Sequence, residues 1–274
     1  MKSRIAQLLV MALAVVLVGA LPAFADGVIY GSANNNNLYS INPTTGVATL
    51  IGSMGQVMTD IAINGSNQMF AIGPLANGNT NLYSINLANG APTTIGSNNN
   101  FLNALGFGSG GTLYAAGGDP VQGGTLFGTV NTGTGAFTSI HNNPGNNSSG
   151  DLAFAFLNGV MYASTFGAIH GTSSDQLWTV NLATGVETFV GNIGKPNVFG
   201  LAVLGGVLYG LDNAGDLLTI NPTTGVGTVV ANNAIGWTGA TSAPDQVVRT
   251  PEPGGLLLLG SGMLALAGVL RRRF

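Results

Sequence analysis

A nine-residue motif that occurs five times is the feature of this sequence that most constrains its fold. Each copy begins with Leu, continues through a β-prone stretch and ends in an Asn-x-x-x-Gly turn. The spacing of the copies is typical of four-stranded propeller blades, which repeat at about 40–45 residues, whereas leucine-rich and β-helical repeats are shorter. The copies are Leu38–Gly46, Leu82–Gly90, Leu126–Gly135 (with one additional residue), Leu177–Gly185 and Leu217–Gly225.

Each copy of the motif belongs to a unit that has the pattern of two β-hairpins. In the turn, Asn can hydrogen-bond its own backbone, Pro where present fixes φ, and Gly accepts the left-handed conformation that closes the loop. A β-prone run follows, as in residues 47–51 and 186–190. The other hairpin has strands such as 60–63 and 68–72, and both faces of these strands are apolar. Apolar faces on both sides favour sheets that stack face to face around an axis.

The number of strands predicts a closed ring. Three strands are expected near residues 28–32, 38–42 and 47–51, four complete units follow, and one strand near 237–242 has no partner in sequence. That last strand would supply the inner strand of the first blade and remove the open sheet edges. The sequence therefore predicts an all-β, five-bladed propeller of four-stranded blades over residues 26–248. An open stack or a two-sheet β-sandwich is the alternative.

The hairpin pattern resembles secreted bacterial β-propellers of the streptogramin-lyase-like and related uncharacterised kinds. The resemblance spans residues 26–248, but its motif is structural, so it implies no catalytic residues.

Charge is nearly absent from this sequence. Asp, Glu, Lys and Arg make up 6% of the residues, where about 25% is ordinary. Lys195 is the only Lys or Arg between Asp26 and Val248, so the body cannot form a phosphate-neutralising patch, and nucleic acid is not an expected partner. The chain also has no cysteine, which excludes disulfides, thiolate metal ligands and thiol catalysis.

The N-terminal segment Met1–Ala25 has the three parts of a secretory signal peptide. Lys2 and Arg4 give the positive start, residues 8–19 are an apolar run, and residues 23–25 offer small side chains for cleavage by signal peptidase. We expect the chain to be exported. The alternative is an uncleaved membrane anchor.

The C-terminal residues 249–274 form a second three-part segment. Pro251, Glu252 and Pro253 precede an uncharged stretch at 254–270, which as a helix is just long enough to span a bilayer. Arginines follow at positions that would stay in the cytoplasm, leaving the body outside. These are Arg271, Arg272 and Arg273.

This tail resembles the PEP-CTERM sorting signal of Gram-negative and related bacteria. The resemblance implies a transmembrane helix that holds the body transiently in the periplasm at the inner membrane. It further implies cleavage near Pro-Glu-Pro by the membrane protease exosortase, followed by release or attachment to the cell surface or its exopolysaccharide. A plain single-span anchor is the alternative.

In a propeller, the loops from second to third strand and from blade to blade share one face. These are the long loops of this sequence, so we call it the long-loop face and the opposite one the short-turn face. Functional loops on a rigid scaffold often gather in this way. The ionisable side chains expected at or beside the long-loop face are Asp60, Asp119, Asp151, Asp175, Asp212, Asp216, Lys195, His141 and His170.

Six of these residues are candidate binding residues, namely Asp60, Asp151, Asp175, Asp216, His141 and His170. Asp60 and Asp151 are expected at the same repeat position, the head of an innermost strand at the channel mouth. A carboxylate there can bind a cation such as Ca²⁺ or a sugar hydroxyl, or it can cap a backbone turn. The two histidines are expected in separate loops, where they are either solvated or metal ligands.

No nucleophile elbow, phosphate loop or His-Glu-x-x-His helix occurs, so the sequence predicts no catalytic residue, dedicated metal site or cofactor. We expect a surface or extracellular-matrix binding module that meets a glycan or another neutral or cationic ligand. A lyase or hydrolase using loop-face His and Asp residues is one alternative. A purely structural matrix protein is the other.

Overall fold

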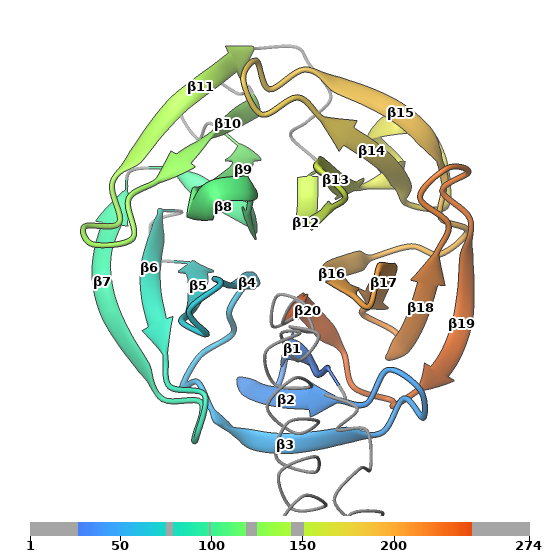
Figure 1. Ribbon diagram of the computed structural model, residues 1–274, viewed down its shortest axis with the longest axis horizontal. Helices are drawn as coiled ribbons and strands as arrows, with labels where there is room; N and C mark the ends of the chain where they lie inside the picture. Colours follow the sequence, from blue (N-terminus) through green and yellow to red (C-terminus); the bar gives the residue numbers. More distant parts are fainter. Residues whose placement is uncertain (1–26, 75–78, 99, 119–124, 144–150, 243–274) are drawn as a thin grey trace, which may run out of the picture.

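The computed structural model describes residues 27–74, 79–98, 100–118, 125–143 and 151–242. Their strands form five four-stranded antiparallel sheets arranged as blades around a central axis (Figure 1), which confirms the predicted propeller. The predicted signal peptide and sorting tail lie outside the described residues. Within the described ranges, no helix combines the length and apolar character that crossing a bilayer requires.

Each blade runs from an inner strand beside the axis to an outer strand on the rim (Figure 1). In that order, the blades are β20 (Trp237–Ser242), β1 (Ile29–Ala33), β2 (Asn37–Ile41), β3 (Ala48–Ser53); β4 (Asp60–Ile63), β5 (Met69–Pro74), β6 (Thr80–Ile85), β7 (Pro92–Asn98); β8 (Phe101–Phe107), β9 (Leu113–Gly118), β10 (Thr125–Val130), β11 (Phe137–Asn143); β12 (Asp151–Leu157), β13 (Val160–Thr165), β14 (Gln176–Val180), β15 (Glu187–Asn192); and β16 (Val198–Leu204), β17 (Val207–Asp212), β18 (Asp216–Ile220), β19 (Gly227–Asn232).

The ring closes as the sequence predicts, through the first and last strands of the described chain. β20 pairs antiparallel with β1, and Ile29 faces Ser242 while Ala33 faces Trp237. The indole of Trp237 is completely buried between the fifth and first blades, where it packs edge-on against the ring of Tyr39. Strands from the two ends of the described chain thus complete the first blade, which favours a single closed ring over an open stack.

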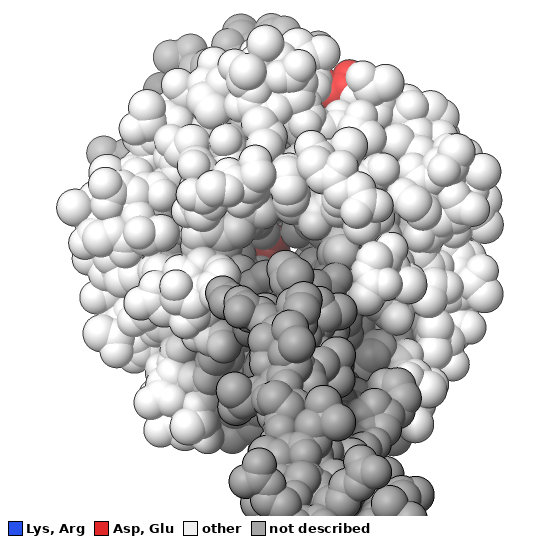
Figure 2. Space-filling model, in the orientation of Figure 1, with Lys and Arg blue, Asp and Glu red and all other residues white. Residues whose placement is uncertain are grey.

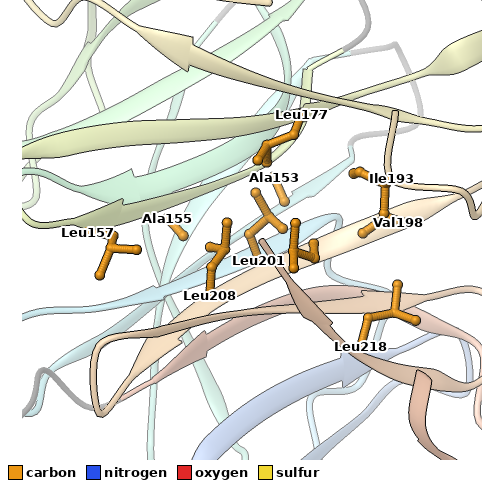
Figure 3. Close-up of a cluster of buried hydrophobic side chains, with 10 residues drawn as sticks. Ala153, Ala155, Leu157, Leu177, Ile193, Val198, Leu201, Leu208 and Leu218 are labelled. Carbon is orange, nitrogen blue, oxygen red and sulfur yellow. The ribbon is translucent and has the colours of Figure 1, made fainter. Parts of the chain in front are cut away.

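The hydrophobic core is divided into five clusters, one between each pair of neighbouring blades. Figure 3 shows the cluster between the fourth and fifth blades, in which Leu157 and Leu177 come from one blade and Leu201, Leu208 and Leu218 from the next. Because both faces of every blade contribute to a cluster, the inner and middle strands are apolar on both sides. This explains why their sequences do not alternate between apolar and polar residues.

The repeated Asn-x-x-x-Gly segments form the predicted turns. In the fifth blade, Asn221 Oδ1 accepts hydrogen bonds from the amides of Thr223 and Thr224 at 2.8 and 3.1 Å, and its carbonyl accepts one from Gly225 at 2.8 Å. Gly225 has a φ of 78°, a conformation that favours glycine. The same conformation occurs at Gly46, Gly90, Gly135 and Gly185.

A β-bulge in each outer strand brings its blade against the turn of the next blade. In the second blade the register shifts after Leu82, so Ile95 is the extra residue and Gly96 lies at the contact. A Cβ atom on Gly96 would overlap the carbonyl oxygen of Thr134, in the turn of the third blade. Gly52 and Gly191 make the same contact in their blades. These glycines therefore set how closely neighbouring blades approach.

Gly96→Ala is expected to lower the free energy of unfolding by about 1–3 kcal/mol, the usual cost of overpacking. The added methyl group would push the third-blade turn away from the second blade, and backbone cannot move as easily as a flexible side chain. Chemical denaturation would measure the loss. Gly118→Ala is the matched control, because a Cβ there meets no atom of the described residues within 4 Å. Equal stability of the two variants would contradict the proposed role of Gly96.

Candidate functional site

The channel mouth on the long-loop face is built by one irregularity repeated in the inner strands. Register shifts in β20, β8, β12 and β16 each leave one extra residue at the start of the strand. In the second blade, the Thr59 amide donates a hydrogen bond to the carbonyl of Ile72. Because Ile72 is already paired with Asp60, Thr59 is equivalent to the extra residues of the other inner strands. A bulge of this kind changes the direction of a side chain. The five equivalent residues are Thr238, Thr59, Asn103, Leu152 and Phe199.

Four of these bulge residues line one cavity. Together with Val57, the side chains of Thr59, Asn103, Phe199 and Thr238 surround about 270 Å³, and we call this cavity the mouth site. None of the five lining residues is charged. The Oδ1 atom of Asn103 is buried and has no hydrogen-bond partner among the described residues. The surface exposed in the mouth site is therefore mostly apolar, and Asn103 Oδ1 is not accessible from it.

The hydroxyls of the mouth site are anchored to the blades behind them. Thr59 Oγ1 donates to the carbonyl of Ile72 at 3.1 Å, and Thr238 Oγ1 donates to Ser32 Oγ at 3.2 Å. Both oxygens keep lone pairs that can accept a hydrogen bond. Both side chains are therefore held in place by hydrogen bonds to the scaffold.

Asp60 directly follows Thr59 of the mouth site in the chain, but the structure places its carboxyl group inside the protein. The side chain is completely buried, with Oδ1 accepting from the amide of Ile61 at 2.8 Å and Oδ2 from that of Leu105 at 2.7 Å. The amide of Ala240 is a third donor. Burial raises the pKa of Asp60 well above its ordinary value, and the three backbone amides oppose that rise.

The three donors to Asp60 come from one position in three inner strands. Ile61 follows Asp60 itself in β4, whereas Leu105 and Ala240 follow the equivalent small residues, Ala104 in β8 and Gly239 in β20. An inner strand has a free edge toward the axis, so its amides need an acceptor there. Asp60 thus ties three blades together at the axis and offers no free oxygen to a ligand at the mouth.

Asp151 does not occupy the position of Asp60, contrary to the prediction. Asp60 faces Ile72 and corresponds to Ala153, which faces Ser164, whereas Asp151 lies two residues earlier and faces Thr165. The two Asp-x-Ala stretches look alike in sequence, but the inner strands before their hairpin turns differ in length. The side chain of Asp151 lies outside the described part of the chain.

Asp175 joins the fourth blade to the fifth. Its Oδ1 accepts from the amide of Gly167 at 3.0 Å and its Oδ2 from that of Val198 at 2.7 Å. The side chain is 1% exposed, and burial raises its pKa, although the backbone amides act in the opposite direction. Like Asp60, this predicted binding residue uses both oxygens inside the protein.

Asp216 belongs to a small charged network in the fifth blade. Its Oδ2 forms an ion pair with Lys195 Nζ at 2.7 Å, and its Oδ1 accepts from Asn232 Nδ2 at 2.7 Å. The hydrogen bond from Lys195 holds the pKa of Asp216 below its ordinary value. Neighbouring Asp212 is buried, and burial raises its pKa, while its Oδ1 caps the amides of Ala214 and Asp216.

The two histidines lie on different blades, and the structure does not bring them together. His141 lies in the outer strand β11 rather than in a loop, because β11 extends further than predicted, and its Cβ packs near Gly185 of the next blade. His170 ends a short 3₁₀ helix (Gly167–His170), 3.3 Å from Thr165 Oγ1 and stacked on the Trp178 ring. Burial lowers the pKa of His170.

Metal-ligating side chains do not gather anywhere in the described ranges: no group of three or more His, Cys, Asp or Glu residues there could hold an ion. Figure 2 shows one face of the ring, where no Lys or Arg is visible among the described residues and acidic residues appear only at the rim and deep in the central opening. Charge is thus sparse on this surface.

The residues of the mouth site were missed by reasoning from the sequence, which looked for titratable groups. A signal does exist: in four blades a bulge residue directly precedes Gly or Ala at the start of the inner strand, and in the remaining blade the corresponding residue precedes Asp. The pairs are Thr238-Gly239, Asn103-Ala104, Leu152-Ala153 and Phe199-Gly200, with Thr59-Asp60 in the remaining blade.

Solved structures share this architecture at low sequence identity. A structural-genomics protein of unknown function from Bacteroides thetaiotaomicron aligns over 77% of this chain and 56% of its own, with a TM-score of 0.51 and 18% identity. The similarity is one of fold. TolB from Acinetobacter baumannii aligns over 79% of this chain and 55% of its own, with a TM-score of 0.49 and 15% identity.

XC5397 from Xanthomonas campestris, described as a gluconolactonase, aligns over 78% of both chains, with a TM-score of 0.47 and 10% identity. This chain thus spans little more than half the length of the first two structures. The sequence matches no protein-family model and no curated protein.

Proposed function

We propose that this protein is an exported, non-enzymatic binding module that is sorted to the cell surface or extracellular matrix and meets its partner at the channel mouth. The mouth site carries the binding part of the proposal, because bulges in separate blades direct side chains into one cavity. Bulges next to a site typically aim side chains at a ligand. Ligand cavities also tend to be concave, mostly apolar and supplied with a few polar groups.

The use of the carboxylates favours binding over catalysis. Asp60 and Asp175 give their oxygens to backbone amides of neighbouring blades, and Asp216 pairs with Lys195. A general acid or base has to reach the substrate proton. Carboxylates that are buried and hydrogen-bonded to the scaffold serve its stability instead. We therefore assign the ligand contacts to the uncharged bulge residues.

In this proposal, the two ends of the sequence are the signals that determine where the protein is sorted. The segment Met1–Ala25 directs export and is removed by signal peptidase. The tail at 249–274 holds the body in the periplasm until exosortase cuts near Pro251-Glu252-Pro253. The propeller then stays at the surface by binding an exopolysaccharide or a similar uncharged partner, or it is released.

Mass spectrometry of the mature protein from cells that contain exosortase tests the sorting. We expect loss of residues 1–25 and of the segment beyond about residue 251. Replacing Pro251 and Glu252 should block only the second cut and leave the protein in the membrane fraction. Replacing Pro222 and Thr223, in a propeller turn, is the control and should leave processing unchanged. Mature chains that end at Phe274 would contradict the proposal.

A further inference from the structure

We propose that the short-turn face of the propeller is a membrane-docking surface, which lies on the lipid headgroups while the tail at 249–274 tethers the precursor. The inference rests on the proposed function, because it takes the tail to be an anchor. It adds the face of the body that meets the bilayer, the side chains that lie there, and the direction in which the mouth site points.

Both ends of the described chain leave the ring at the short-turn face. In the second blade, the first and second strands are joined there by the turn at 64–68, and Ile63 comes directly before this turn. In the first blade, the equivalent strands are β20 and β1, and Ser242 at the end of β20 faces Ile29 at the start of β1. Ser242 and Ile63 also line the same cavity. The chain therefore has its two ends where the other blades have a short turn.

Each membrane-directed segment predicted from the sequence is thus connected to the same face. The signal peptide ends at Ala25, two residues before the described chain begins, and the uncharged stretch of the tail starts at Gly254, twelve residues after Ser242. Fully extended, twelve residues span at most about 40 Å. The long-loop face lies a whole strand further away, about 20 Å for six residues. The tether therefore favours the short-turn face as the one nearest to the bilayer.

Five partly exposed valines lie at the short-turn face. Three of them directly follow the Asn-x-x-x-Gly turns of the first, fourth and fifth blades, and two follow the turns between the first and second strands of a blade. Their exposed fractions lie between 37% and 60%. Binding at a lipid interface strengthens with the apolar area that it buries, so these side chains favour docking. The five residues are Val47, Val186, Val226, Val160 and Val207.

Most charged groups of the described chain lie toward the opposite face. The ion pair of Lys195 and Asp216 lies beside the long loops, as do the carboxyl groups of Asp175 and Asp212. Among the described residues at the short-turn face, Glu187 at the start of β15 is the only charged one. Docking this face therefore removes little charge from water, a step that is costly. Because these residues include no Lys or Arg, the docking should not require anionic lipid.

The mouth site points away from the bilayer in this arrangement. Thr59 of the mouth site comes directly before β4, whereas Ile63 ends the same strand at the short-turn face. A partner outside the membrane can therefore reach the mouth site both before and after the tail is cut. The short-turn face, in contrast, becomes free only after the cut.

Single-cysteine labelling tests the orientation, because the chain has no cysteine of its own. The full chain is reconstituted into vesicles of phosphatidylethanolamine and phosphatidylglycerol, which contain no exosortase, and headgroup spin-labelled lipids quench a fluorophore attached to the protein. The fluorophore is placed at Val226→Cys or, on the long-loop face, at Ile169→Cys, where the native side chain is 44% exposed. We expect roughly threefold or more stronger quenching at position 226, because the long-loop face lies about 20 Å further away. Vesicles without phosphatidylglycerol should give the same result.

A charge added to the short-turn face locates the contact. Val47→Asp in the Val226→Cys protein should lower the quenching, because the new carboxylate would lose hydration at the lipid surface. Ile169→Asp, on the opposite face, is the matched control and should leave the quenching unchanged. Unchanged quenching in Val47→Asp, with a wild-type melting curve, would contradict the role of the valines.

The two ways in which this experiment can fail are distinguishable. Equal quenching at positions 226 and 169, or stronger quenching at 169, in a protein that floats with the vesicles would overturn the docking surface and leave the tail as an anchor. Failure of the full chain to float would reject the anchor, and the docking surface with it.

Discussion

Trp237→Ala is expected to lower the free energy of unfolding by about 3–5 kcal/mol, the usual cost of removing a large buried aromatic side chain. For a domain of this size that corresponds to a fall in Tm of roughly 6–20 °C. Trp237 belongs to the only strand that joins the end of the described chain to its beginning. Its ring packs over Gly31 and against Tyr39, so the substitution opens a cavity where the ring closes. Thermal and denaturant unfolding would measure the effect.

The second tryptophan of the chain provides the matched control. Trp178 is only partly buried, donates to Gln176 and stacks on His170, so Trp178→Ala should cost less than half as much. Trp237→Phe should cost less than about 1.5 kcal/mol, because the buried indole Nε1 of Trp237 has no partner among the described residues and its removal offsets part of the lost contact area. Equal losses for the two Trp→Ala variants would argue against Trp237 as the closing residue.

The fold could be predicted because the same pattern of strand and turn residues occurs five times in the sequence. The Asn-x-x-x-Gly turns have local hydrogen bonds and a glycine conformation that short sequence patterns encode. Closure of the ring could be predicted by counting strands, because the first blade lacked one strand and the strand near residue 237 was the only one left without a blade. Both inferences depend on chemistry within a few residues or on a count along the chain.

The site could not be predicted in the same way, because its features depend on register and on contacts between blades. A difference in strand length moves Asp151 away from the position of Asp60, and sequence similarity alone does not show it. The role of Asp60 depends on the amides of Leu105 and Ala240, which belong to other blades and lie far away in sequence. The uncharged residues of the mouth site become recognisable only when bulges bring them into one cavity.

The engagement of Asp60 with three inner strands predicts a large loss of stability in Asp60→Ala. The equivalent residues of the other blades are Gly239, Ala104, Ala153 and Gly200, so alanine fits this position. The variant would leave the amides of Ile61, Leu105 and Ala240 without their acceptor. Because each buried unpaired donor costs about 1–3 kcal/mol and water can satisfy some of them, we expect a total loss of about 2–5 kcal/mol.

The pH dependence of stability separates this role of Asp60 from simple packing. Burial raises the pKa of the folded-state carboxyl above its unfolded value of 3.8, so the folded protein holds this proton more tightly. The stability that this tighter proton binding contributes is therefore fully present below the unfolded pKa and is lost as the pH rises through the folded pKa. Asp60→Asn keeps one acceptor oxygen and cannot titrate, so it should be more stable than Asp60→Ala and should lack this decline. Urea unfolding of wild type and both variants at a series of pH values would measure it. A wild-type decline that persists in Asp60→Asn would assign the proton to another group, such as Asp175 or Asp212, whose pKa values burial also raises.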